Sequence, residues 1–493
     1  MLFPNLNPNS KTPLYEQLYL HIKEEIHKGN LKKDQQLPSK RALAGFLNIS
    51  INTITDAYEQ LVDEGYLRSL ERRGYFVEDL NLQYVEQGVE KFDNLAEAKE
   101  DHRVNFSFNT VDEDLFPYTI WRKCYRDAVA KDSQLLNDPN PRGSLGLRVE
   151  IAKYIYSSRG ADVSPQQIII SAGTEFLLFL INQLVPRDTV FAVEDPGYER
   201  LSHIFEVGGR EFLPISLDEE GMKTRDLEKS PATIACVTPS HQFPTGCIMP
   251  LARRMDLLDW AQKKENQYIL EDDYDSEFRY SGRPIPSLKS MDRGDRVIYM
   301  GSFSKCISPS LRISYMVLPK KLLEIYQNKL TVFQCPVSAS SQRALEIFIK
   351  TGSFEKHLNR MRNHYRKKRE VFVKSLEKYF PQGQVQGEEA GLHLLLHLAS
   401  PMDEESLVQG LVEKGYFLRG LNEFRAKGSK SASPTLVLGF GSLDLDEIDD
   451  SIRDLKEDIA RMEAEYWKNG QNWSSSFWPW EDFWPILFGQ KTM

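Results

Sequence analysis

The chain has 493 residues, which is too many for one ordinary hydrophobic core, so two or three domains are expected. Its composition, 41% hydrophobic and 27% charged with a net charge of -9, is typical of a globular protein and excludes a global attraction to nucleic acid. No signal-peptide pattern, membrane-length apolar run or metal-ligand cysteine spacing occurs, so we expect a cytoplasmic protein with reduced thiols, no metal site and no membrane association.

Residues 10–79 are predicted to form a small winged helix-turn-helix domain, an α+β fold. Apolar residues recur at helical spacing from residue 14 to residue 26, and a second helix is expected to begin after Ser39, its predicted N-cap. A tight turn at residues 48–50 precedes a third helix. Two short alternating strands then flank a charged tip at residues 71–74, as a wing does.

Only the placement of charge in this domain suggests DNA binding, because its acidic and basic side chains balance. Basic residues at a helix start and at the wing tip would meet phosphates, while polar residues of the third helix would meet base edges. A solvated surface would carry the same residue types, so the order of the motifs supports the prediction more than any single one. The predicted DNA-binding residues are Lys40, Arg41, Asn52, Thr53, Arg72 and Arg73.

The rest of the chain divides into three predicted parts. Residues 80–103 are rich in acidic residues with little periodicity and indicate a linker. Residues 104–468 alternate short apolar runs with helical segments, which predicts an α/β fold with a mostly parallel sheet covered on both faces. A long helical stretch over residues 340–380 opens a smaller α+β subdomain, and residues 469–493 form an aromatic-rich tail of unassigned role.

Lys305 and its neighbours suit pyridoxal 5'-phosphate (PLP). That cofactor needs a lysine amine to form a Schiff base, an acid facing its pyridine nitrogen, and cations and hydroxyls for its phosphate. Lys305 lies among serines, seven residues before Arg312, and follows a strand that ends in an Asp-x-Tyr sequence. Upstream, a Gly-Thr pair opens a helix whose free N–H groups would bind phosphate, and a tyrosine after the next strand could stack on the ring. The predicted cofactor-binding residues are Gly173, Thr174, Tyr198, Asp272, Tyr274, Ser302, Ser304, Arg312 and Lys305, the last also being the predicted catalytic residue.

These motifs resemble known families. The first domain resembles the GntR winged helix through Leu37-Pro38-Ser39-Lys40-Arg41 and Glu64-Gly65-Tyr66-Leu67, although Ile51 stands where that family commonly has arginine. The body resembles fold type I PLP-dependent aminotransferases, with Phe243 in place of the asparagine of their Asn-Pro-Thr-Gly turn. The fusion is similar to the MocR/GabR subfamily of bacterial transcription regulators, most clearly over residues 238–244, 271–278 and 311–319.

The resemblance implies a PLP-dependent regulator that binds double-stranded operator DNA as a head-to-tail homodimer. It places Asp272 on the pyridine nitrogen, Tyr274 on O3′ and Tyr198 over the ring, with Lys305 in the Schiff base. Arg200 and Arg425 match the subfamily's effector-binding arginines and would hold the carboxylate of an amino-acid-like effector. Leu115 replaces a histidine of that site, so the effector stays open.

Two alternatives remain at this point. PLP itself could be the regulatory ligand. The chain could also be an aminotransferase acting on an amino acid and a 2-oxo acid, with Lys305 as proton shuttle. The fusion to a DNA-binding domain argues against an enzyme as the main role, although partial transamination is compatible with the same residues.

Overall fold

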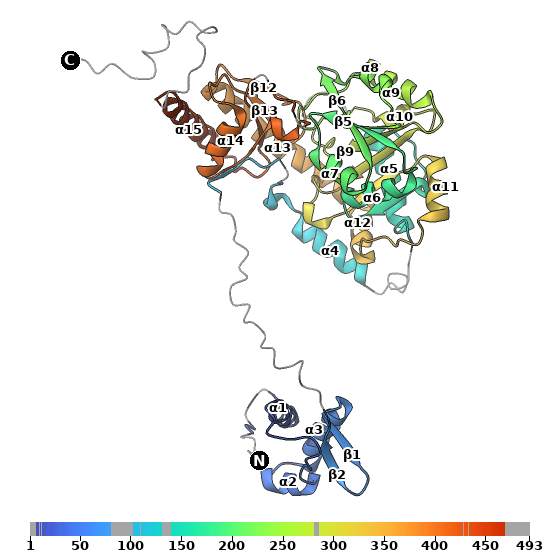
Figure 1. Ribbon diagram of the computed structural model, residues 1–493, viewed down its shortest axis with the longest axis vertical. Helices are drawn as coiled ribbons and strands as arrows, with labels where there is room; N and C mark the ends of the chain where they lie inside the picture. Colours follow the sequence, from blue (N-terminus) through green and yellow to red (C-terminus); the bar gives the residue numbers. More distant parts are fainter. Residues whose placement is uncertain are drawn as a thin grey trace, which may run out of the picture. The chain divides into compact units, whose positions relative to one another are not determined.

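The computed structural model describes residues 6–8, 10, 12–79, 102–108, 110–130, 140–280, 285–426, 428–431 and 433–468 (Figure 1). The contacts fall into two compact units divided near residue 100. All but the last two residues of the predicted linker, and the whole predicted tail, lie outside the described residues. The boundaries of those two segments therefore stay predictions.

The N-terminal unit has three helices and a hairpin: α1 (Leu14–His27), α2 (Lys40–Leu47), α3 (Ile51–Asp63), β1 (Leu67–Leu70) and β2 (Gly74–Val77). Ser39 caps α2 by accepting the N–H of Ala42, as the sequence predicted, and Ser50 caps α3 in the same way. The buried residues of α3 follow the helical period along one face, from Ile54 to Leu61. The predicted winged helix-turn-helix is confirmed.

A mostly parallel sheet of eight strands forms the centre of the second unit. Its neighbours from β10 to β6 run parallel, whereas β11 and β7 run antiparallel to the strands beside them. The order across the sheet is β4 (Ile168–Ser171), β11 (Ser314–Val317), β10 (Val297–Ser302), β9 (Tyr268–Asp273), β8 (Ile234–Val237), β5 (Val190–Asp195), β6 (Glu211–Asp218) and β7 (Gly221–Met222).

Helices cover both faces of this sheet, which accounts for the continuous apolar runs in its strands. Ile168 and Ile170 of β4 pack into the core that includes α5 (Leu145–Arg159), while Ile169 between them packs into the core on the other face. That second core includes α6 (Thr174–Leu184), α7 (Glu199–Val207) and α11 (Lys320–Lys329). A third core holds α8 (Thr224–Lys229), α9 (Leu251–Gln262) and α10 (Leu288–Met291) (Figure 1).

The predicted helical stretch over residues 340–380 is in fact two helices, α12 (Ala339–Lys350) and α13 (Ser353–Tyr379). Gly352 separates them with a φ of +70°, a left-handed conformation that glycine adopts without strain. The nearest buried apolar side chains on either side, Phe348 and Phe354, are six positions apart, so the helical spacing is interrupted at the break.

Beyond α13 lies the smaller α+β subdomain. Its antiparallel sheet has the order β12 (Gln384–Gln386), β13 (His393–His397), β16 (Thr435–Gly439) and β15 (Arg419–Gly420). Two helices, α14 (Glu404–Glu413) and α15 (Ile448–Lys468), pack beside it (Figure 1). Near the start of the unit, β3 (Val104–Asn105) pairs with β14 (Tyr416–Phe417), and α4 (Tyr118–Val129) packs against α12. None of the described helices could cross a membrane, since none is both long and apolar enough.

Candidate cofactor site and DNA-contacting surface

The predicted cofactor-binding residues follow the carboxyl ends of the central strands. Asp272 is the last residue but one of β9, Ser302 ends β10 shortly before Lys305, and Tyr198 comes after β5. Parallel strands end at one edge of a sheet, and ligands of α/β folds bind there. Residues more than a hundred positions apart in the sequence are thus brought to a common edge.

Lys305 is partly buried, and its Nζ donates a hydrogen bond to the carbonyl oxygen of Phe108 at 2.5 Å. Burial lowers the pKa of Lys305 from 10.5 to about 8, since a charged ammonium loses hydration in the interior. The neutral amine is the nucleophilic form. At pH 7 about a tenth of Lys305 is therefore neutral and able to react with an aldehyde, a far larger share than at the ordinary pKa of 10.5.

One carboxylate oxygen of Asp272 accepts no hydrogen bond. Its Oδ1 is buried and has no hydrogen-bond partner in the structure. Burial, followed by the charge of Asp273, raises the pKa of Asp272 to about 7. A positively charged N–H against Oδ1 would supply the missing hydrogen bond and return the carboxyl to its ionised form, and a protonated pyridine nitrogen offers such a group.

Tyr274 takes part in a buried polar cluster that the sequence did not indicate. Its hydroxyl lies 2.9 Å from Nδ1 of His241, and the same Nδ1 lies 2.8 Å from Oδ2 of Asp275. The ring of His393 lies tilted against that of His241, with centroids 5.2 Å apart. His241, Asp275 and His393 each bring one ligand-type atom within 4.8 Å of the others. Because Nδ1 of His241 is already engaged by Asp275 and Tyr274, we interpret the cluster as one that orients the tyrosine hydroxyl.

A cradle for an anion lies at the start of α6. Gly173 has a φ of +92°, a backbone conformation that side-chain-bearing residues rarely adopt, so the position favours glycine, and the side-chain ends of Arg312 and Glu175 lie where a Cβ would stand. Thr174 is the first residue of α6, whose N-terminal N–H groups favour negative charge. The hydroxyls of Ser302 and Ser304 lie 2.9 Å apart at the end of β10.

The side chain of Glu175 lies in this cradle, and the sequence did not indicate that contact. Its Oε2 pairs with Nη2 of Arg312 at 2.5 Å, and its Oε1 lies 3.7 Å from Nη1 of Arg200. One carboxylate therefore bridges the arginine expected for the cofactor phosphate and one of the two expected for the effector. The side chains of both arginines are at least half exposed, so another anion can reach them.

Arg425 is brought to the same edge by hydrogen bonds between two loops. Gly197 donates its N–H to the carbonyl of Phe424 at 2.9 Å, and Ala426 donates to the Asp195 side chain at 2.9 Å. These bonds place Arg425 beside the loop that leads to Tyr198 and Arg200. The Nε of Arg425 is buried and has no hydrogen-bond partner within the described part of the chain, so this guanidinium can still bind an anion.

The aromatic rings of the site form their own small core. Tyr198 and Tyr274 both meet the ring of Phe243 edge to face, with centroids 6.0 and 6.1 Å away. Phe108 and Phe424 complete this cluster. Burial raises the pKa of Tyr198 to about 12, so its hydroxyl stays protonated. The unpartnered acceptor of Asp272, the glycine-dependent cradle and the low-pKa lysine together fit PLP.

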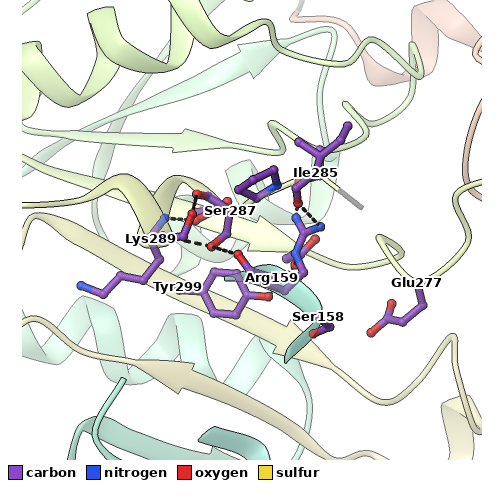
Figure 2. A network of polar contacts seen from close by, with 12 residues as sticks. Ser158, Arg159, Glu277, Ile285, Ser287, Lys289 and Tyr299 are labelled. Carbon is purple, nitrogen blue, oxygen red and sulfur yellow. Dashed lines mark hydrogen bonds and ion pairs between the residues drawn. The ribbon is translucent and has the colours of Figure 1, made fainter. Parts of the chain in front are cut away.

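A buried polar network supports the strand end that carries Asp272 and Tyr274 (Figure 2). Nε of Arg159 lies 2.7 Å from Oδ2 of Asp273 and forms an ion pair with it. This contact is not a hydrogen bond, because the Nε–H does not point at the carboxylate. Tyr299 donates to the same oxygen at 2.5 Å. Arg159 also donates to Ser240 at 2.5 Å and to the carbonyl of Ile285 at 2.7 Å, which ties β9 to the 238–246 turn.

The predicted DNA-binding residues differ in exposure and in whether their side chains already have partners within the protein. Arg41, Asn52, Arg72 and Arg73 are exposed at the start of α2, the start of α3 and the wing tip. Lys40 pairs with Glu59 at 3.3 Å and lies over the Tyr75 ring, so it would have to leave that pair to contact phosphate. The hydroxyl of Thr53 lies 2.9 Å from that of Ser50 in the α3 cap, so part of its hydrogen-bonding capacity is used.

Comparison with known proteins assigns each of the two units to a family. Residues 14–77 match the family model described as bacterial regulatory proteins, gntR family, and residues 101–433 match aminotransferase class I and II. An uncharacterized HTH-type transcriptional regulator of Bacillus subtilis, YdeL, is 38% identical, over 92% of this chain and 98% of its own length. The probable rhizopine catabolism regulatory protein MocR of Rhizobium meliloti is 29% identical, over 93% and 96%. The chain belongs to the MocR/GabR subfamily of GntR-type transcription regulators.

Solved structures agree with this assignment. The kynurenine aminotransferase of Pyrococcus horikoshii, solved in complex with PMP, is 26% identical with a TM-score of 0.64, over 73% of this chain and 91% of that one. This MocR/GabR member therefore has a fold type I aminotransferase-like domain behind a GntR winged helix, as the sequence predicted. It is a DNA-binding regulator whose cofactor is PLP.

Proposed function

We propose that this regulator senses an amino-acid-like amine at its PLP site and converts binding into a change in DNA affinity. The observation that supports this most directly is the pair of hydrogen bonds that brings Arg425 beside the loop that leads to Arg200. The buried Nε of Arg425 has no partner among the described residues. Two guanidinium groups at the mouth of an amine-reactive site suit a ligand with both an amine and a carboxylate.

Within the site we assign each residue a role. Lys305 holds the cofactor through its amine, Asp272 faces the pyridine nitrogen, and Tyr274, oriented by His241, faces O3′. Tyr198 covers the ring. The phosphate is assigned to Gly173, Thr174, Ser302, Ser304 and Arg312. PLP supplies an aldehyde carbon that primary amines attack reversibly, which is the property a sensor of amines needs.

Arg200 and Arg425 would select the effector by its carboxylate. For binding to change the DNA-bound state, the effector must have different affinities for the two conformations of the domain. The exposed Arg200–Glu175–Arg312 bridge offers one source of such a difference, because an effector carboxylate on Arg200 and a phosphate on Arg312 both compete with Glu175. The same exposure also supports PLP itself as a regulatory ligand.

The DNA-binding role is assigned to the exposed basic and polar residues of the winged helix. Arg41, Arg72 and Arg73 would contact phosphates and Asn52 a base edge, with Lys40 and Thr53 joining after release from their internal partners. We further propose that the regulator acts as a head-to-tail homodimer in the cytoplasm, where operator DNA lies. Turnover as an aminotransferase is assigned at most a partial role.

A gel-shift assay on the chain's own upstream DNA tests the proposal. The protein is assayed without PLP, with PLP, and with PLP plus a panel of amines that do or do not carry a carboxylate. We expect a ligand-dependent change in DNA affinity that is lost in Arg200→Gln and Arg425→Gln. Absence of DNA binding under every condition, together with many turnovers of an amino acid and a 2-oxo acid per site, would replace this proposal with the aminotransferase alternative.

A further inference from the structure

A hollow of about 180 Å³ lies between the segment that follows β9 and helix α13, outside the cofactor site. Its lining combines three arginines with neutral hydrogen-bonding groups and contains no carboxylate. The lining residues are Arg279, Tyr280, Asn359, Arg362, Asn363 and Arg366.

The three arginines have no acidic partner among the residues that the structure describes. Arg362 donates to the backbone carbonyl of Glu277 at 2.6 Å and to the side-chain oxygen of Asn359 at 3.1 Å. Arg366 donates to the side-chain oxygen of Asn363. All of these acceptors are neutral. The adjacent Arg369, by contrast, faces Glu388 at 3.6 Å, so carboxylates occur nearby but do not enter the hollow.

The lack of a negatively charged partner is clearest at Arg279. Its Nε and Nη1 are buried and have no hydrogen-bond partner among the residues that the structure describes. Buried polar groups are almost always satisfied, and a buried guanidinium without a counter-charge is costly. Three like charges around one hollow also repel each other. Each of these costs disappears when an anion occupies the hollow.

We propose that this hollow is a second ligand site that binds the phosphate group of a small phosphorylated molecule. Guanidinium forks match phosphate oxygens in geometry and charge, and the two asparagines and the tyrosine can satisfy the remaining oxygens. The volume of about 180 Å³ is well above what a single water needs, so the hollow has room for a phosphate group.

The site is connected to the cofactor site by short covalent and hydrogen-bonded paths. Arg279 lies five residues after Tyr274 on the same segment. Tyr280 donates to the carbonyl of Gly391 at 2.7 Å, and a Cβ at Gly391 would collide with His241 and Asp275. An anion bound to Arg279 and Arg366 would join α13 to this segment. The second ligand would therefore affect the group that orients Tyr274.

The experiment uses the full chain loaded with PLP, so that the cradle at Gly173 is already filled. The unfolding midpoint is followed while inorganic phosphate is added, with chloride at matched ionic strength as the comparison. We expect a saturable rise of about 2 °C or more with phosphate and none with chloride. The rise should be lost in Arg279→Gln and in Arg366→Gln.

Arg366 is exposed, so its variant should fold even if Arg279→Gln does not. The matched control is Arg461→Gln, which removes one exposed arginine of α15 whose partners are Glu457 and Asp458. This control should keep the full response to phosphate. Unchanged visible absorbance of bound PLP in all variants would show that the cofactor site is intact.

Three results would overturn the proposal. The first is the absence of a saturable phosphate effect, or its survival in both variants. In the second, phosphate has no effect and the variants bind unrelated double-stranded DNA more weakly. That result would mean that the hollow contacts the DNA backbone. The third is dissociation of the variants into monomers without any phosphate effect, which would assign the arginines to a subunit interface.

Discussion

Replacing Glu175 with glutamine should tighten PLP binding. In the structure the Glu175 carboxylate holds Arg312 at 2.5 Å and lies 3.7 Å from Arg200, at the glycine-dependent cradle where the cofactor phosphate is assigned. Glutamine keeps the size of the side chain and removes its charge. The variant therefore tests whether Glu175 competes with the phosphate or merely positions the arginine.

The magnitude follows from two contributions. An exposed ion pair of the Glu175–Arg312 kind is worth about 0.5 kcal/mol, and the phosphate must break it. A carboxylate and a phosphate of about two negative charges at roughly 5 Å repel by about 1.7 kcal/mol in water, which salt screening near 0.15 M reduces to about 1 kcal/mol. The sum of about 1.5 kcal/mol corresponds to a roughly tenfold lower Kd for PLP.

The assay is titration of PLP-free protein followed by the visible absorbance of the bound cofactor. Raising the salt concentration should shrink the gain, because both contributions are electrostatic. Glu265→Gln serves as the control, since it also removes one exposed carboxylate, whose partner is Lys321 at 2.6 Å outside the site. It should leave the Kd unchanged.

A weaker or unchanged affinity in Glu175→Gln would refute the reasoning. Weaker binding would mean that Glu175 holds Arg312 in the orientation the phosphate needs. An unchanged Kd would mean that the cofactor phosphate does not occupy this cradle. Either result would also remove Glu175 as a source of coupling between the cofactor and the effector.

Further predictions concern the lysine, the wing and the buried network. The rate of PLP uptake should rise as pH rises through about 8 and level off above it, because only neutral Lys305 reacts, and a rate that is flat from pH 6 to 9 would contradict the lowered pKa. The Lys305→Ala variant should lose the visible absorbance of the bound cofactor. Arg72→Ala with Arg73→Ala should weaken DNA binding and flatten its salt dependence, and an unchanged slope in gel shifts would mean that the wing does not touch phosphate. Arg159→Leu should lower the free energy of unfolding by about 3–5 kcal/mol in urea, since it leaves Asp273 buried without its cation, whereas a loss below ~1 kcal/mol would show that Tyr299 alone suffices.

The sequence by itself determined the features that are local or ordered along the chain. Helical spacing and the Ser39 cap depend on residues a few positions apart, so the order of residues was enough to predict the winged helix. The α/β body followed from apolar runs that alternate with helical segments. The order of Gly173, Asp272, Lys305 and Arg312 indicated the cofactor, because PLP needs each of those groups whatever the details of the fold.

Only the tertiary structure decided which side chains satisfy one another. The bridge from Glu175 to Arg312 spans 137 positions, and His241 meets Asp275 across 34, so no sequence spacing could reveal either contact. The break at Gly352 was missed because a single glycine inside a helical pattern is a weak signal for the end of a helix. Among the described residues no carboxylate lines the hollow around Arg279, and this can be recognised only from which side chains are neighbours in space.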